Sequence, residues 1–236
     1  MRYDDVVSAV FLERPNRFIA RVSLSGKEEV VHVKNTGRCR ELLVPGCRVY
    51  LASSDNPVRK TKYDLIAVEK MRDGRPPLLI NMDAQAPNAA VGEYLRGSRW
   101  VSKPDLVKGE VRYGASRFDF YLEKGRRRVF LEVKGVTLED NGIALFPDAP
   151  TLRGVKHLEE LSRSVREGYE AAVFFLIQMK DVRVFRPNDM MHPAFGEALR
   201  QAAESGVTVL AYDSVVTPEG MTVGDPVPVD LERKRS

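Results

Sequence analysis

The chain has 236 residues, of which 43% are hydrophobic and 30% charged, an ordinary balance for a protein that folds around an apolar core. No apolar run approaches the ~20 residues that cross a bilayer, and the start of the chain, MRYDDVV, does not resemble a secretory leader. We therefore expect a cytoplasmic protein without a membrane partner. The formal net charge of +4 permits binding to a polyanion without requiring it.

The first 85 residues predict short β-strands separated by turns. Phe18, Ala20, Val22 and Leu24 alternate with mostly polar residues, the period of a strand with one buried face. Five or six such strands favour a small closed barrel of the OB type, because closure removes exposed strand edges. The predicted strands are Val6 to Leu12, Arg17 to Leu24, Glu28 to Lys34, Arg48 to Ala52, Tyr63 to Lys70 and Leu78 to Met82.

A break rich in Asn, Pro, Gly and small residues follows, with a short helix through Tyr94, and we place a domain boundary at residues 85/86. Residues 86–236 predict strands interleaved with helices, a mixed α/β (α+β) layer fold. Ala171 to Gln178 is a continuous apolar run, typical of a strand covered on both faces. The other predicted elements are the strands Arg117 to Glu123, Val129 to Lys134 and Val207 to Tyr212, and the helices Arg153 to Gly168 and Phe195 to Ser205.

Two neighbouring strands carry the strongest candidate for chemistry. Glu132 and Lys134 are two apart, so they project from the same face of their strand. A hairpin would bring Asp119 near Glu132, and Glu110 is a third carboxylate close by. Converging carboxylates suit Mg²⁺ or Mn²⁺, and a lysine beside them can stabilise the charge that builds on phosphorus. Asp119, Glu132 and Lys134 are therefore the predicted catalytic residues, with Glu110, Asp119 and Glu132 as the predicted metal ligands.

The same pattern has a simpler interpretation. Glu-x-Lys is common on solvated strand faces, where cross-strand pairs of these residues give modest stability. The setting favours a site, because Asp119 lies between two phenylalanines and Glu132 follows an apolar run. The arrangement is then the D…ExK pattern of nucleases that cut phosphodiester backbones.

Two further blocks carry candidate nucleic-acid-binding residues. Arg153, Lys156 and His157 fall in the first turns of a predicted helix, whose N-terminus attracts phosphate. In the simpler interpretation, Asp148 and Thr151 before them only form the turn and the helix cap, and His157 is a structural hydrogen-bonding residue. The second block is the turn Asn35-Thr36-Gly37 with Arg38, which could contact a nucleic acid or a nucleotide on the barrel, or be an ordinary turn.

The two cysteines, Cys39 and Cys47, match no CxxC pattern and no zinc spacing with the three histidines. We expect both to be reduced and structural in a chain without a secretion signal. Lys and Arg gather in several short clusters, such as Lys124 to Arg128. Each cluster alone is typical of solvated surface, but together they make nucleic acid a candidate partner.

In order along the chain, the blocks NTGR…ELLVPG, VRYGASRFDFYLE, VFLEVKGVTL, FPDAPTLRGVKHLEEL and GVTVLAY resemble the sugar fermentation stimulation protein (SfsA) family. The resemblance implies an N-terminal OB-like barrel and a C-terminal domain similar to PD-(D/E)xK nucleases. It also implies non-specific DNA binding and a regulatory role in sugar (maltose) metabolism. The nuclease pattern falls on Asp119, Glu132 and Lys134, with Glu110 upstream, and the family's own blocks fall on Asn35, Thr36, Gly37 and Arg38 and on Asp148, Thr151, Arg153, Gly154, Lys156 and His157.

The leading hypothesis is thus a non-sequence-specific DNA-binding protein with a nuclease-like site for Mg²⁺ or Mn²⁺. Two alternatives remain open at this stage. One is an active, metal-dependent nuclease on DNA or RNA, and the other is a regulator that senses a nucleotide.

Overall fold

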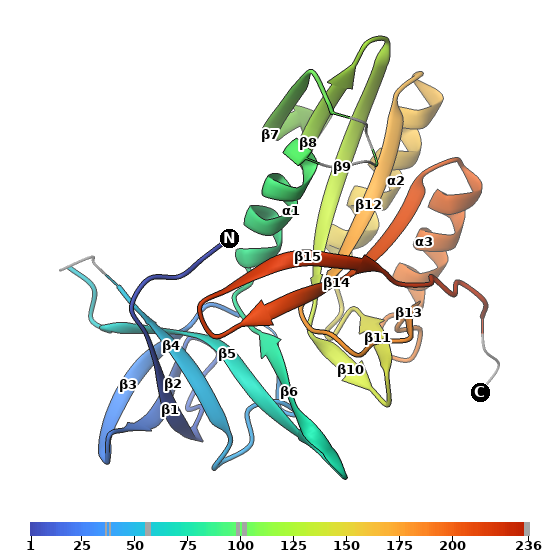
Figure 1. The fold of residues 1–236 in the computed structure, drawn as a ribbon. Helices are drawn as coiled ribbons and strands as arrows, with labels where there is room; N and C mark the ends of the chain where they lie inside the picture. The colour runs from blue at the N-terminus through green and yellow to red at the C-terminus, as the bar shows by residue number, and fades with distance from the viewer. Residues whose placement is uncertain (36, 38, 55–57, 98–99, 101–102, 234–236) are drawn as a thin grey trace.

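The computed structural model of the protein describes residues 1–35, 37, 39–54, 58–97, 100 and 103–233. A small barrel occupies one end of the molecule, and a mixed sheet with helices on both faces occupies the other (Figure 1). None of the described helices is long and apolar enough to cross a membrane.

The barrel is built from strands β1 to β6, which form one sheet in the order β3-β2-β1-β4-β5-β6. A parallel pairing of β3 with β5, through His32 to Asp64 and Val33 to Leu65, closes the sheet on itself. Closure leaves β6 as an extension beyond the barrel, and the OB-like prediction is confirmed. The strands are β1 Val6–Glu13, β2 Ile19–Leu24, β3 Lys27–Val33, β4 Arg48–Ser53, β5 Tyr63–Arg72 and β6 Arg75–Asn81.

One residue of the predicted buried face is exposed, and another, Leu24, is half-buried. Ala20 and Val22 are fully buried in the barrel, but Phe18 is 47% exposed. It precedes the first residue of β2, where the strand period no longer applies, and the Arg17 guanidinium lies 4.6 Å from the centre of its ring. The contact with Arg17 covers one face of the ring at the surface.

The second part contains a six-stranded sheet in the order β15-β14-β12-β9-β8-β7. β12 lies at its centre, parallel to both β9 and β14, and its residues Ala171 to Ile177 are buried on both faces, as predicted. A small sheet of β10, β11 and β13 lies beside it. The strands are β7 Leu106–Tyr113, β8 Ser116–Lys124, β9 Arg127–Val136, β10 Leu138–Asp140, β11 Ile143–Phe146, β12 Glu170–Ile177, β13 Val184–Pro187, β14 Thr208–Thr217 and β15 Gly220–Pro226.

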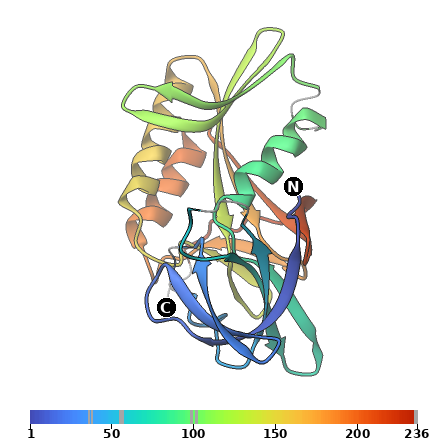
Figure 2. The same ribbon diagram turned by 90° about the vertical axis from the view of Figure 1, so that its left-hand side faces the viewer.

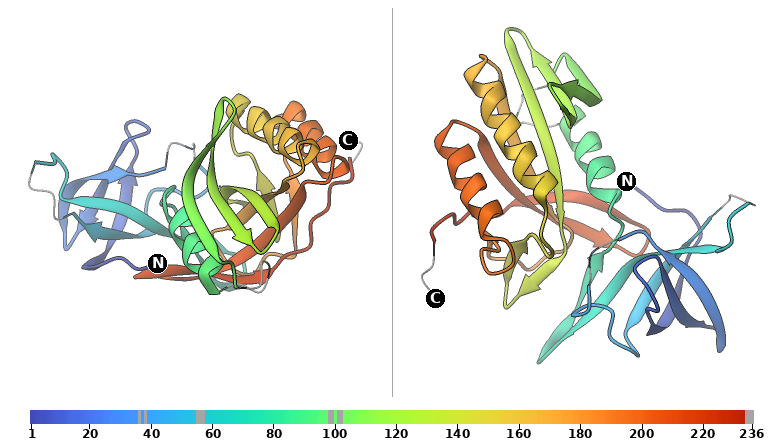
Figure 3. Two further views of the ribbon diagram at one scale, coloured as in Figure 1. Left: turned by 90° about the horizontal axis from the view of Figure 1, so that it is seen from above. Right: turned by 180° about the vertical axis from the view of Figure 1, so that it is seen from behind.

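Within the described residues, three helices cover the six-stranded sheet. Helix α1 (Ala86–Gly97) packs on one face, against β7, β9 and β15. Helices α2 (Leu152–Arg166) and α3 (Pro193–Glu204) pack together on the other face, as the side and rear views show (Figures 2 and 3). The buried side chains on the α2 and α3 face are continuous with the interior of the barrel. The two parts of the chain therefore share one apolar core.

The sequence predicted the buried strands but not the edge and connecting strands. β7 was missed because almost every side chain in it is exposed or half-exposed, so it shows no apolar period. β10, β11 and β13 are only three or four residues long, and β15 has Gly, Asp and Pro among its seven residues. The start of the chain also joins this sheet, because Arg2 pairs with Gly220 at the beginning of β15.

Both cysteines are free, with Cys39 buried and Cys47 half-buried. Burial first, and Asp148 next, raise the pKa of Cys39 to about 12. A thiol with so high a pKa carries almost no reactive thiolate at neutral pH.

Candidate functional site

The site forms where β8 and β9 pair as an antiparallel hairpin. Phe118 and Phe120 would share a face in a regular strand, yet they pack in different layers of the domain. The ring of Phe118 lies edge-on to His157 of α2, whereas the ring of Phe120 lies against Gly92 of α1. The alternation of side chains therefore changes face at Asp119, whose carboxylate is bonded to Asn88 of α1 and to the backbone of β9.

Glu132 is the buried centre of the site. It is 3% exposed, and its Oε1 atom lies 2.5 Å from Nζ of Lys134 and 2.5 Å from Nδ1 of His157. Its other oxygen, Oε2, is buried and accepts no hydrogen bond from any of the described residues. A buried carboxylate oxygen without a donor is costly, and it is unusual enough to call for a reason such as a bound ion.

Asp119 is held by one atom from each neighbouring element. Its Oδ1 accepts a hydrogen bond from Nδ2 of Asn88 in α1 at 2.8 Å, and its Oδ2 accepts one from the backbone N–H of Val133 in β9 at 2.8 Å. The second bond ties Asp119 to the residue between Glu132 and Lys134. The carboxylate is therefore fixed beside Glu132 before any ligand binds.

The surroundings move the pKa values of the two carboxyls in opposite directions. Burial, and then the charge of Glu132, raise the pKa of Asp119 above its ordinary value. Burial also acts to raise the pKa of Glu132, but the hydrogen bond from His157 and the ammonium of Lys134 outweigh it, so the pKa of Glu132 is lowered. The fold thus favours the ionised form of Glu132. The repulsion between the two carboxylates acts on Asp119, where it disfavours the ionised form.

The residues present fit a divalent cation only in part. Asp119 and Glu132 are close enough to affect each other's charge, and Oε2 of Glu132 is an orphaned acceptor. However, the described residues include no group of three or more His, Cys, Asp or Glu side chains arranged to hold a metal ion. A cation would be bound by these two carboxylates, with water filling the other positions, which is the usual way that proteins bind Mg²⁺.

The third predicted ligand, Glu110, has a different environment. It is an exposed residue of β7 with a left-handed backbone (φ 53°), and its Oε2 pairs with Nη1 of Arg117 at 3.2 Å. It lines the same cavity as Asp119 but is not part of a three-carboxylate cluster.

This cavity, of about 520 Å³, lies between the β7–β8 hairpin and the start of α2. The exposed side chains of Arg153 and Lys156 line it, together with Arg112 and Arg117 from the hairpin. Helix α2 begins as predicted, with Oγ1 of Thr151 accepting a hydrogen bond from the backbone N–H of Gly154. The cavity thus combines two carboxylates with a largely cationic rim.

His157 has a more interior position than a nucleic-acid-binding residue usually has. It is 4% exposed and lies on the floor of the cavity, with Nδ1 on Glu132 and Nε2 facing Nε of Arg153 at 3.3 Å. The structure therefore links it to the carboxylate site as well as to the cationic rim.

Asn35 and Gly37, from the turn that follows β3 in the barrel, lie at the junction of the two parts of the chain. Gly37 lies against Asp148, and Nη1 and Nη2 of Arg14 donate to the backbone oxygens of Gly37 and Asn35, at 2.9 and 2.6 Å. Thr36 and Arg38, which we predicted to bind nucleic acid, lie outside the described residues. The described part of the turn is thus packed against the loop that leads into α2.

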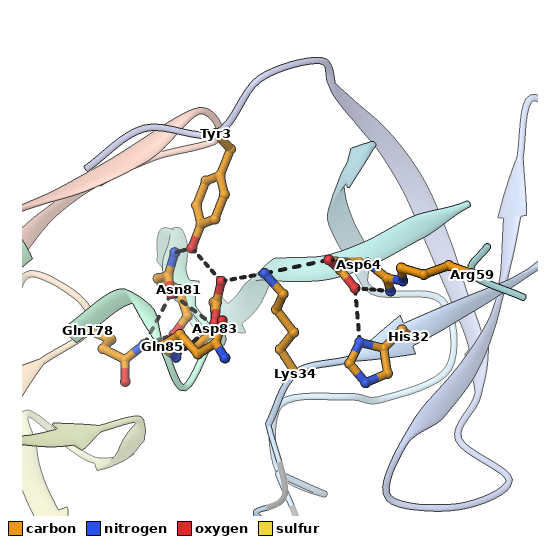
Figure 4. A network of polar contacts seen from close by, with 9 residues as sticks. All are labelled: Tyr3, His32, Lys34, Arg59, Asp64, Asn81, Asp83, Gln85 and Gln178. Carbon is orange, nitrogen blue, oxygen red and sulfur yellow. Dashed lines mark hydrogen bonds and ion pairs between the residues drawn. The ribbon is translucent and has the colours of Figure 1, made fainter. Parts of the chain in front are cut away.

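A network of polar side chains connects the barrel to α1 (Figure 4). Nζ of Lys34 lies 3.5 Å from Asp64 and 3.3 Å from Asp83, two carboxylates that are almost fully buried. Asp83 in turn accepts a hydrogen bond from the backbone N–H of Gln85, just before α1. The helix that presents Asn88 to Asp119 therefore starts from a point anchored on the barrel.

Gln178 belongs to the same network and connects it to the strand that carries Lys134. Its side-chain nitrogen donates to the backbone oxygens of Asn81 and Asp83, and the side chain packs against Gly135 directly after Lys134. Sequence reasoning missed both Gln178 and Asn88. Neither has a local signal, because each acts on a residue far away in the chain.

Fold and site together define a two-domain α+β protein, in which an OB barrel precedes a mixed-sheet domain with a Glu–His–Lys cluster whose carboxylate and imidazole are buried. Two family models match the chain: the SfsA N-terminal OB domain over residues 12–75, and the sugar fermentation stimulation protein RE domain over residues 85–220. The chain belongs to the sugar fermentation stimulation protein family.

Its relatives match it along nearly the whole length. A sugar fermentation stimulation protein homolog of Desulfitobacterium hafniense is 55% identical over 231 residues, covering 98% of this chain and 99% of that protein. A homolog from Ruminiclostridium cellulolyticum is 53% identical over 216 residues, covering 92% and 93%. The solved structure of Pyrococcus furiosus SfsA in complex with Ca²⁺ superimposes with a TM-score of 0.86 at 27% identity, covering 98% of both chains.

Proposed function

We propose that the protein binds DNA without sequence specificity and holds a divalent cation, Mg²⁺ or Mn²⁺, between Asp119 and Glu132. The observation that carries the proposal is the orphaned Oε2 of Glu132, a buried acceptor on a carboxylate whose neighbours Asp119 and His157 line a largely cationic cavity. The Ca²⁺ in the structure of the Pyrococcus furiosus relative supports a site for a divalent cation in this fold.

The chain's own residues account for phosphate binding. Arg112, Arg117, Arg153 and Lys156 line the cavity and would contact phosphate oxygens, while Asp119 and Glu132 would hold the ion. A divalent cation at this place supplies a Lewis acid that polarises a phosphoryl oxygen. Contacts to phosphate read no bases, so the binding would be non-specific. A role of such binding in regulating sugar metabolism is part of this proposal.

The test is fluorescence anisotropy with labelled single- and double-stranded DNA and RNA, at several salt concentrations, with and without Mn²⁺. We expect the logarithm of the affinity for duplex DNA to fall with the logarithm of the salt concentration, with a slope near −0.9 per phosphate contact. Lys156→Ala should remove about one phosphate contact and make this slope correspondingly shallower. Lys27→Ala is the matched control, because Lys27 is exposed at the far turn of the barrel. An affinity that does not change with salt would contradict the proposal.

A second candidate, a metal-dependent nuclease on DNA or RNA, is favoured by Lys134. Its ammonium lies 2.5 Å from Glu132, and in this hypothesis it would stabilise the charge on a reacting phosphate. Mn²⁺-dependent cleavage should then disappear in both Asp119→Ala and Lys134→Ala. Cleavage that survived either change would exclude this site as its source, and the binding proposal would still stand.

A further inference from the structure

The two ring nitrogens of His157 face two different parts of the site. Nδ1 lies 2.5 Å from Oε1 of Glu132, and Nε2 lies 3.3 Å from Nε of Arg153. An arginine Nε–H can only donate, so Nε2 of His157 is the acceptor and carries no proton. Nδ1 must then carry the proton and donate it to Glu132, which defines the tautomer of the ring.

On the Glu132 side, this bond fixes the rotation of a carboxylate. His157 and Lys134 both approach Oε1, so Oε2 is the oxygen left without a donor. A rotated carboxylate would exchange the two oxygens. His157 therefore determines which oxygen of Glu132 is available to a cation.

On the other side, the bond fixes a guanidinium group. Arg153 uses Nε on His157, and within the described residues its Nη1 and Nη2 atoms make no hydrogen bond. Its side chain is exposed and lines the cavity. The free edge of the guanidinium is the edge that binds two phosphate oxygens at once.

The ring itself is held in place by its surroundings. It is 4% exposed, and its plane lies at 83° to the ring of Phe118, with the centroids 6.2 Å apart. It projects from the second turn of α2, whose start is fixed by the Thr151 cap. A ring held in this way acts as a spacer of constant size between the groups on its two nitrogens.

From these contacts we propose that His157 is a positioning residue for the metal and the phosphate at once. It orients Oε2 of Glu132 toward the cation and the Nη edge of Arg153 toward a phosphate group of a phosphodiester substrate. It thereby sets the separation between the two binding groups. This inference rests on the proposed function, because it assigns a role within the same site.

Two conservative variants separate the two halves of this role. The amide nitrogen of asparagine comes close to the position of Nδ1, so His157→Asn keeps a donor for Glu132 and loses the contact with Arg153. The amide oxygen of glutamine reaches the position of Nε2, so His157→Gln keeps the acceptor for Arg153 and loses the donor for Glu132. His157→Phe loses both and keeps the packing on Phe118.

The measurements are Mn²⁺ affinity by calorimetry and affinity for a labelled single-stranded oligonucleotide in the absence of metal, both with the full chain. In His157→Gln we expect Mn²⁺ affinity to fall about 10- to 100-fold, the usual cost of losing a residue that orients a metal ligand, with oligonucleotide affinity close to wild type. In His157→Asn we expect the reverse, and in His157→Phe a loss of both. Ser162→Ala is the control, because among the described residues this buried hydroxyl of α2 donates to the backbone oxygen of Leu158 in the same helix and not to the site.

A second measurement needs no variant. Nitrogen-15 spectra of the wild-type protein at pH 8 should show His157 in the tautomer with the proton on Nδ1. Sequence-specific assignment distinguishes its signals from those of His32, whose Nδ1 also faces a carboxylate, at 2.9 Å from Asp64. A proton on Nε2 would overturn the inference, as would asparagine and glutamine variants that alter both affinities equally or neither. Wild-type protein that binds neither Mn²⁺ nor the oligonucleotide would overturn the proposed function, and the inference with it.

Discussion

Gly37 in the barrel and Asp148 in the mixed-sheet domain lie so close that a Cβ atom at position 37 would overlap Oδ2 of Asp148. The two residues belong to separate blocks of the sequence, one following the third barrel strand and the other preceding α2. Their contact joins the barrel to the loop from which Arg153 and His157 follow. The barrel therefore contributes directly to the position of the candidate site.

Gly37→Ala should weaken this contact. The new methyl group must displace Asp148 or the turn, at a cost of about 1–3 kcal/mol, as for other overpacked positions. Thermal unfolding would measure the loss. Gly97→Ala is the control, because a Cβ there meets nothing within 4 Å. An unchanged melting temperature in Gly37→Ala would show that the contact is not tight in solution.

Asp119→Asn should stabilise the metal-free protein while abolishing Mn²⁺ binding. The pKa of Asp119 is raised by burial and by Glu132, so the stability linked to this group is present below its ordinary value of 3.8 and is lost as pH rises through the folded-state pKa. An amide removes the repulsion at neutral pH, for a gain on the order of 0.5–2 kcal/mol. Denaturant titration with EDTA at pH 7 measures it, and a destabilised variant would argue against repulsion at this pair.

The contribution of Glu132 to stability should change with pH in the direction opposite to that of Asp119. Its pKa is lowered, so its stabilising effect is present above its ordinary value of 4.5 and is lost as pH falls through the lower folded-state pKa. In Glu132→Gln the free energy of unfolding should therefore depend less steeply on pH below 4.5. Asp64 and Glu139 also have lowered pKa values, so part of the slope remains. An unchanged slope would mean that Glu132 is not stabilised as a carboxylate.

Lys34→Met should destabilise the junction between the barrel and α1. The substitution keeps the length of the side chain but leaves Asp64 and Asp83 without the ammonium between them, at a cost of about 1–3 kcal/mol. Lys60→Met is the matched control, since Lys60 is an exposed lysine of the barrel. Equal melting temperatures in the two variants would show that Lys34 does not connect the two carboxylates in solution.

Much of the fold was predictable because burial leaves a local pattern. The central strand β12 is apolar throughout, and α2 shows a helical apolar stripe, so both were found within one or two residues of their observed ends. β7 was not, because an exposed edge strand has no apolar period. Of the candidate site, the sequence predicted that Asp119, Glu132 and Lys134 lie together on two neighbouring strands, and the structure brings them together.

The sequence by itself determined which elements form and which side chains share a strand face, because both depend on residues close together in the chain. Only the tertiary structure decided how these side chains are used. In it, Asp119 accepts a hydrogen bond from the amide of Asn88, and Oε1 of Glu132 contacts both His157 and Lys134. No described residue donates to Oε2 of Glu132. The tertiary structure also placed Glu110 with Arg117 at the cavity rim. These choices depend on packing between strands, helices and barrel that are distant in sequence, and no local pattern records such contacts.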